Sequence, residues 1–207
     1  LTLSGSSTLT RSDADLSFTE SSSRDTLGYF LDAQDADGDG SPDLVIGAID
    51  NSDVGTYAGK AYVVFDPDSL SSQSISTAAS VTILANAAGD QMGLPIFFVN
   101  DLPDDGDGLP EIGVGAFLSN NAATDDGSFS IFYSSTTGAT GSYTLSDADI
   151  TLVGDSASAG FGVSGDVADV TGDGVDDILV GSYYDDSASF FDGSLLTVTG
   201  NASTTGF

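Results

Sequence analysis

The sequence contains no cysteine, no histidine and no tryptophan, and only three of its 207 residues are basic. Without cysteine there is no disulfide framework and no thiolate metal site. Without histidine the commonest general base and the imidazole metal ligand are both missing. Arg11, Arg24 and Lys60 are too few to form a basic patch, so we expect no nucleic-acid partner. No apolar run approaches the roughly 20 residues of a membrane span, so we expect no membrane insertion.

Acidic residues are abundant instead. There are 32 of them against 3 basic residues, which gives a net charge of −29, and because only Glu20 and Glu111 are glutamates, the other 30 are aspartates. Aspartate favours loops and turns. Together with 26 glycines and no long helical periodicity, this bias predicts an all-β fold of short strands and many turns. With 40% hydrophobic residues the chain can bury a core, and its acidic surface predicts cations as partners.

One unit occurs three times. An acidic loop precedes an apolar strand at residues 35–43 (Asp-Ala-Asp-Gly-Asp-Gly-Ser-Pro-Asp), 105–111 (Asp-Gly-Asp-Gly-Leu-Pro-Glu) and 169–177 (Asp-Val-Thr-Gly-Asp-Gly-Val-Asp-Asp). Each loop follows a strand that begins at a glycine, and a further glycine-led strand comes after it. An alternating run opens each unit, at residues 15–18, 80–84 and 149–153. The spacing, close to 70 residues, predicts three propeller blades of four short antiparallel strands each.

The shared residues resemble a known family. Phe161-Gly162, Gly47-Ala48 and Gly115-Ala116, with the acidic loop between such pairs, resemble the FG-GAP repeat of integrin α-subunit propellers and of many secreted bacterial proteins. The resemblance extends over nearly the whole chain. It departs from the family pattern where Leu27 and Met92 stand in place of Phe and where Ser182 stands in place of the last Ala. It implies blades at residues 13–78, 79–146 and 147–207.

Residues 9–18 echo residues 143–152, so we expect residues 1–12 to be the tail of a preceding blade. Propellers close with four to eight blades. The chain is therefore predicted to be part of a larger propeller or to close by assembling with other chains. An open stack of three blades is a third possibility, and its exposed strand edges would favour pairing between chains.

The acidic loops are predicted to bind up to three Ca²⁺ ions. Alternating carboxylates and a backbone carbonyl make a cage of hard oxygen ligands, which suits Ca²⁺ better than Mg²⁺. The predicted ligands are Asp35, Asp37, Asp39, the Ser41 carbonyl and Asp43 in the first loop; Asp105, Asp107, the Leu109 carbonyl and Glu111 in the second; and Asp169, Thr171, Asp173, the Val175 carbonyl and Asp177 in the third. The first ligand of the second loop is left open between Asp101 and Asn100. The neutral Thr171 predicts weaker binding in the third loop.

Other interpretations fit less well. Metal-free Asp-Gly turns are common singly but do not explain three copies at blade spacing. EF-hands require Glu at loop position 12, where this chain has Ile46, Val114 and Val180. The pairs at residues 125–126 and 185–186 could act as general acid and base, but solvated loops are the simpler interpretation. We therefore expect no enzyme.

The composition and the resemblance together predict a secreted or cell-surface module. It would bind calcium and serve adhesion, ligand binding or structural assembly, with a protein or glycan ligand or copies of itself as partner. The alternative is a non-catalytic accessory propeller domain of a secreted hydrolase. A pure scaffold is the third hypothesis.

Overall fold

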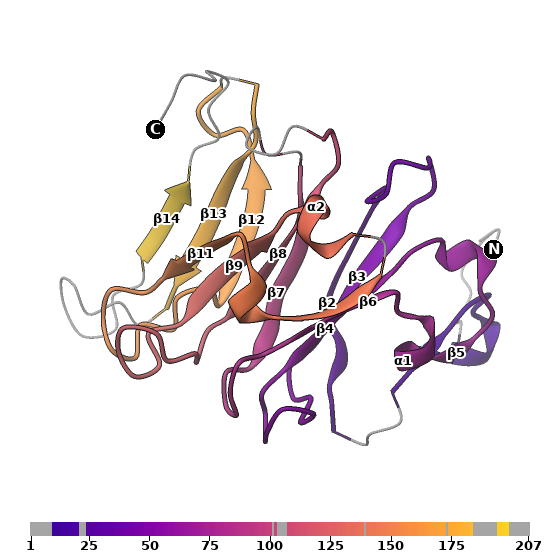
Figure 1. The fold of residues 1–207 in the computed structure, drawn as a ribbon, viewed down its shortest axis with the longest axis horizontal. Helices are drawn as coiled ribbons and strands as arrows, with labels where there is room; N and C mark the ends of the chain where they lie inside the picture. Colours follow the sequence, from indigo (N-terminus) through magenta and orange to yellow (C-terminus); the bar gives the residue numbers. More distant parts are fainter. Residues whose placement is uncertain are drawn as a thin grey trace.

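The computed structural model describes residues 10–20, 24–100, 102, 107–138, 140–172, 174–183 and the backbone of 194–198. The fold is all-β, as predicted, and none of the sheets in the described residues closes on itself (Figure 1). The first sheet has the order β10 (Gly141–Thr144), β6 (Val81–Leu84), β4 (Lys60–Val64), β3 (Asp43–Ala48) and β2 (Leu27–Gln34). The second has the order β11 (Ile150–Val153), β9 (Ser128–Phe132), β8 (Glu111–Ala116) and β7 (Met92–Val99).

The third sheet contains β12 (Ser164–Ala168), β13 (Asp177–Ser182) and β14 (Ser194–Val198). A small parallel pair joins β1 (Phe18–Thr19) to β5 (Gln73–Ser74). The helices are single turns: η1 (Arg11–Asp13), η2 (Pro67–Ser69), α1 (Ile75–Ala78), α2 (Ser134–Thr137) and η3 (Leu145–Asp147). Among the described residues no helix is both long and apolar enough to cross a membrane.

The sheets are offset from the sequence repeats by one strand. The alternating run of the second repeat forms β6, which pairs with β4 of the first repeat, and the alternating run of the third forms β11, which pairs with β9 of the second. Each outer strand therefore covers the edge that the preceding repeat would leave open. The connection after β9 also adds β10 parallel to β6, as β5 lies parallel to β1. This makes five strands in the first sheet and three in the described part of the third, where four were expected.

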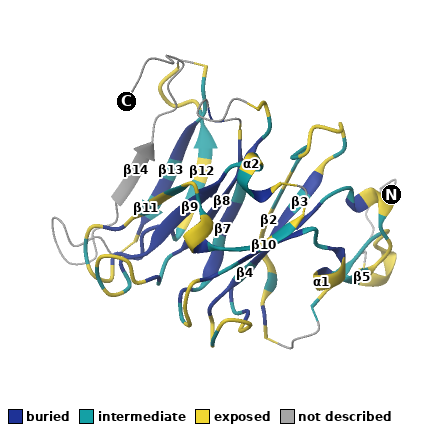
Figure 2. Ribbon diagram, in the orientation of Figure 1, coloured by how far each residue is buried: buried dark blue, intermediate teal, exposed yellow. Residues whose placement is uncertain are grey.

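The three sheets pack face to face in an open fan, with β7 lying between β2 and β12 (Figure 1). One apolar core fills the space between the first and second sheets and includes Val63, Ile96 and Val114. A second core between the second and third sheets includes Ile131 and Val180. A third lies on the outer face of the first sheet. Burial is greatest in β3, β4, β8 and β9, whereas β2, β11 and β12 are intermediate or exposed (Figure 2).

The repeated glycines meet where the sheets touch. A Cβ atom added to Gly47 of β3 would lie 2.3 Å from the carbonyl oxygen of Gly93 in β7. One added to Gly115 of β8 would lie 2.1 Å from the carbonyl oxygen of Gly162, just before β12 of the third repeat. Real Cβ atoms do not approach backbone oxygens so closely. The glycines that define the repeat in sequence are thus required by sheet-to-sheet packing.

The echo between residues 9–18 and 143–152 also appears in the structure. Thr10 and Thr144 each precede a 3₁₀ turn, and each backbone N–H donates to the carboxylate of an aspartate three residues on, over 2.8 Å in both cases. Both turns form the same capping box. The two segments therefore share one local structure; residues 1–9 of the predicted blade tail lie outside the described residues.

Candidate metal centre

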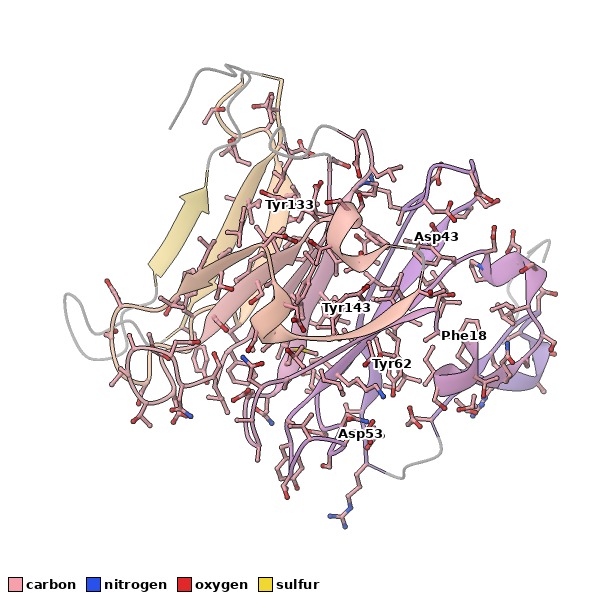
Figure 3. All side chains as sticks on the ribbon, viewed as in Figure 1. Phe18, Asp43, Asp53, Tyr62, Tyr133 and Tyr143 are labelled. Atoms are coloured by element: carbon pink, nitrogen blue, oxygen red, sulfur yellow. The ribbon has the colours of Figure 1, made fainter. Side chains whose placement is uncertain are left out.

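The first acidic loop connects β2 to β3 at one end of the first sheet. Asp43 marks this end in Figure 3, and Asp53 marks the opposite end. Asp35, Asp37 and Asp39 each offer a carboxylate oxygen, and these three oxygens lie within 4.8 Å of one another. The loop therefore brings together three of the five predicted ligands.

Backbone hydrogen bonds hold this loop in shape. The N–H groups of Gly38 and Gly40 donate to the two carboxylate oxygens of Asp35, over 2.8 and 3.0 Å. Both glycines have positive φ, +79° and +94°, which other residues adopt only with strain. The N–H of Ser41 donates to Asp39 over 2.7 Å, which closes a further turn. The carboxylates are thus positioned by the loop backbone.

Asp43, at the end of the loop and the start of β3, is fully buried. Its carboxylate accepts the N–H of Ala36 over 2.8 Å and the N–H of Asp66 over 2.9 Å, so it ties the start of the loop to the turn after β4. Burial raises the pKa of Asp43 above its usual value; the two N–H donors oppose this effect, and the charges of Asp37 and Asp35 add to it. In this structure the carboxylate of Asp43 stabilises the loop through these two hydrogen bonds. Its role as a metal ligand stays a prediction.

Asp66 is a member of the site that sequence reasoning missed. The pKa of its carboxyl is raised, first by the charge of Asp39 and then by burial and a hydrogen bond with Asp39. Its position follows from strand register, because Val64 of β4 pairs with Leu44 of β3 and so places the next turn beside the loop. The only signal in the sequence is an acidic residue just after the glycine-led strand, which is too weak to identify a ligand.

The third loop repeats the hydrogen bonds of the first. Asp169 accepts the N–H groups of Gly172 and Gly174 over 2.6 and 2.9 Å, as Asp35 accepts those of Gly38 and Gly40. The buried Asp177 accepts the N–H of Val170 over 2.9 Å and that of Thr171 over 3.0 Å. Val175 belongs to the same described segment, whereas Asp173 lies outside the described residues. Two loops in different sheets therefore share one backbone frame.

The second loop differs from the other two in the residues that the structure describes. Asp101 and Asp105 lie outside the described residues. The buried Glu111 accepts the N–H of Leu102 over 3.0 Å, a contact like that between Asp43 and Ala36 but with a longer loop between the partners. Asn100, the other candidate for first ligand, accepts a hydrogen bond from Gln34 over 2.7 Å and donates to Asp176. It thus connects the loop ends of all three sheets.

Asp107 of the second loop accepts the hydroxyl of Ser134 and the N–H of Leu109, and these hydrogen bonds lower the pKa of its carboxyl. Ser134 stands where the first sheet has Asp66, because Phe132 pairs with Ile112 as Val64 pairs with Leu44. The second loop therefore contacts a neutral hydroxyl where the first contacts a fourth carboxylate.

The turn that carries Asp125-Asp126 is exposed at residues 120–122 and 124, as expected of a solvated loop, but Asp126 departs from that expectation. Asp126 is fully buried. Burial raises its pKa, but the N–H donors of Asn121, Ala123 and Ala122 outweigh burial, so that the pKa lies below its usual value. Asp126 holds the turn after β8 together. The second pair, residues 185–186, lies outside the described residues.

No family of known proteins and no curated protein matches this sequence. The resemblance to FG-GAP repeats therefore stays a prediction, and the chemistry of the site follows from its own residues. Carboxylates gathered on a rigid loop repel one another. Three hard, anionic oxygen donors fit a divalent cation, and Ca²⁺ accepts such flexible oxygen sets more readily than Mg²⁺.

Proposed function

We propose that this chain is a calcium-binding β-propeller module of the FG-GAP type, which acts outside the cell in adhesion, ligand binding or structural assembly. The observation that carries the proposal is the convergence of Asp35, Asp37 and Asp39 within 4.8 Å on a loop whose hydrogen-bond frame recurs around Asp169. Asp66 adds a fourth carboxylate beside the first loop.

The stacking of sheets supports the propeller part of the proposal. Successive sheets repeat the same glycine contacts and exchange outer strands in the same way. A regular step between identical neighbours is what allows sheets to continue around a ring. Further repeats, in this chain or in associated chains, would complete it.

Calcium would hold the first acidic loop and the turn after β4 together. A divalent ion held by Asp35, Asp37 and Asp39 would neutralise the repulsion among them and would also attract Asp66, so that the turn after β4 is drawn to the loop. The expected consequence is stability that depends on calcium, in a protein whose charge of −29 otherwise favours expansion.

The test is thermal unfolding of EDTA-treated protein with and without CaCl₂, with MgCl₂ as the competing ion. A ligand at about 100 times its dissociation constant stabilises the native state by about 2.7 kcal/mol, which corresponds to a rise of roughly 5–10 °C for a domain of this size. Isothermal titration calorimetry supplies the number of ions bound.

A double substitution, Asp35→Asn with Asp39→Asn, should remove most of the gain. Asp68→Asn is the control for the loss of surface charge, since it removes a charge from an exposed residue of η2 outside the loop. Identical melting curves in EDTA and in calcium would refute the metal assignment.

A further inference from the structure

A partly enclosed cavity of about 230 Å³ lies at the end of the second sheet opposite its acidic loop. Its wall is formed by β9, β11, the turn after β8, the segment before β7 and the turn η3. Most of its lining side chains are hydroxyls and amides, together with the apolar Ala87 and Leu145 and a single carboxylate, that of the buried Asp90. This end of the molecule has no part in the candidate metal centre.

The equivalent place in the first sheet is filled by the protein itself. Tyr62 of β4 is buried, packs in the same apolar cluster as Ile75, and donates its hydroxyl to Glu20 over 2.7 Å. The ammonium of Lys60 lies 4.9 Å from the centre of the Tyr62 ring and 2.8 Å from the carboxylate of Asp53. Figure 3 shows Tyr62 and Asp53 together in this part of the first sheet.

Strand register identifies the counterparts of these side chains. Ser128 pairs with Ala116 as Lys60 pairs with Ala48, so that Ser130 is the counterpart of Tyr62. Asn121 follows Ala116 by five residues, as Asp53 follows Ala48. Serines therefore stand in the second sheet where the first has the long side chains of Lys60 and Tyr62, and Asn121 stands where the first has Asp53. The cavity lies where the longer side chains of the first sheet would fit.

The polar groups that remain are arranged for hydrogen bonding. Ser119 and Ser128 share a hydrogen bond of 2.8 Å, and Asn121 donates to Ser119 over 2.9 Å. Within the described residues, the hydroxyl of Ser130 makes a single hydrogen bond, with the hydroxyl of Thr151 at 3.5 Å, which is at the limit of a hydrogen bond. A hydroxyl can donate once and accept twice. The buried Ser130 and the exposed Thr151 therefore keep hydrogen-bonding capacity for a ligand.

The lining excludes most classes of ligand. The described wall carries no basic side chain, so phosphate and carboxylate ligands would go unpaired. An apolar ligand would leave buried hydroxyls unsatisfied. A cationic amine would meet one carboxylate in the described wall, that of Asp90, but would find the neutral Asn121 where the ammonium of Lys60 finds Asp53. The volume is below the roughly 300–1,000 Å³ of sites for drug-sized molecules, which limits the ligand to about one ring.

We propose that this cavity binds a neutral polyhydroxylated ligand of about one sugar ring, with Ser130, Thr151 and Asp90 as hydrogen-bonding partners. The inference rests on the ligand-binding part of the proposed function and needs no calcium, because none of the acidic-loop residues contributes to the cavity wall. Asp90 would supply an acceptor for ligand hydroxyls, since its carboxylate lines the cavity and has the backbone N–H groups of Ala87 and Asn86 as its other donors.

The experiment is saturation-transfer NMR and calorimetry with the methyl glycosides of glucose, galactose, mannose and N-acetylglucosamine, in calcium and in EDTA. Propylammonium chloride and sodium phosphate are the charged comparison probes. We expect at least one glycoside to bind with a dissociation constant on the order of 1 mM. Binding of propylammonium in place of every glycoside, or of none of the probes, would overturn the inference.

The decisive variant places in the second sheet the side chains that fill the equivalent space of the first. It combines Asn121→Asp, Ser128→Lys and Ser130→Tyr. It should weaken glycoside binding at least tenfold, while Ser76→Tyr, at an exposed position of α1, should leave it unchanged. Ser130→Ala, which keeps the cavity open, should weaken binding several-fold and guards against misfolding of the triple variant. Unchanged affinity in Ser130→Ala and in a folded triple variant would refute the site. Calcium stabilisation without glycoside binding would defeat this inference alone and leave the metal proposal standing.

Discussion

The first and second sheets follow the same strand plan, yet they differ at both ends. At the loop end, Asp66 of the first sheet faces Asp39, whereas Ser134 of the second donates to Asp107. At the opposite end, Tyr62 fills a space that Ser130 leaves open. The shared backbone carries the packing, so side chains at equivalent positions are free to carry different chemistry. The first sheet gathers negative charge at its acidic loop, and the second sheet has a polar cavity at its opposite end.

The largest expected effect is a difference in stability between substitutions of Tyr62 and of its counterpart Ser130, at the ends of the two sheets opposite their acidic loops. Tyr62→Ala removes a buried aromatic ring from a filled site and should lower the free energy of unfolding by about 3 kcal/mol. Ser130→Ala, at the counterpart position beside a cavity, should change it by less than about 1 kcal/mol. Urea unfolding followed by circular dichroism measures both. Equal losses would mean that the two sites are packed alike.

A smaller difference in stability is expected between substitutions of two carboxylates at this end of the sheets, Asp126 in the second and Asp53 in the first. Asp126→Asn replaces one oxygen of a buried carboxylate that accepts three backbone N–H groups by an NH₂ donor, and should cost about 2 kcal/mol at pH 7. Asp53→Asn breaks an ion pair whose carboxylate side chain is 57% exposed and should cost less than about 1 kcal/mol. Chemical denaturation of each variant measures the difference.

The loss in Asp126→Asn should also depend on pH. The folded pKa of Asp126 is lowered, so its contribution is fully present above the unfolded value of about 3.9 and disappears as the pH falls through the folded pKa. The difference between the parent protein and the variant should therefore stay constant from pH 7 to about 5 and shrink below about 4. A difference that persisted unchanged at pH 2 would show that the N–H donors do not favour the ionised form.

The smallest expected effect exchanges the residues at the loop end. Asp66→Ser should raise the melting temperature in EDTA, because it removes a charge that Asp39 opposes, and should reduce the gain produced by calcium. Ser134→Asp should do the reverse in the second sheet, since it places a carboxylate beside Asp107. Melting curves of both variants with and without calcium test the pair. Calcium gains equal to those of the parent protein would remove Asp66 from the site.

Much of the candidate site was predictable from local spacing. The turns around Asp35 and Asp169 depend on glycines and aspartates only a few residues apart, and the structure joins them as the repeat suggested. The contributions of Asp66 and Ser134 were not predictable, since they come from strands whose register only the folded sheet defines. The burial of Asp126 was missed for a similar reason: its carboxylate is covered by a turn that closes over it.

The residues alone determine the β class, the three-fold repeat and the acidic loops, because each of these depends on composition or on neighbours along the chain. Only the packed sheets decide that β6 and β11 join the preceding repeats and that Gly47 and Gly115 must remain glycines. The same packing closes one polar space with Tyr62 and leaves its counterpart open. These outcomes follow from contacts between segments distant in sequence, whose geometry no local pattern specifies.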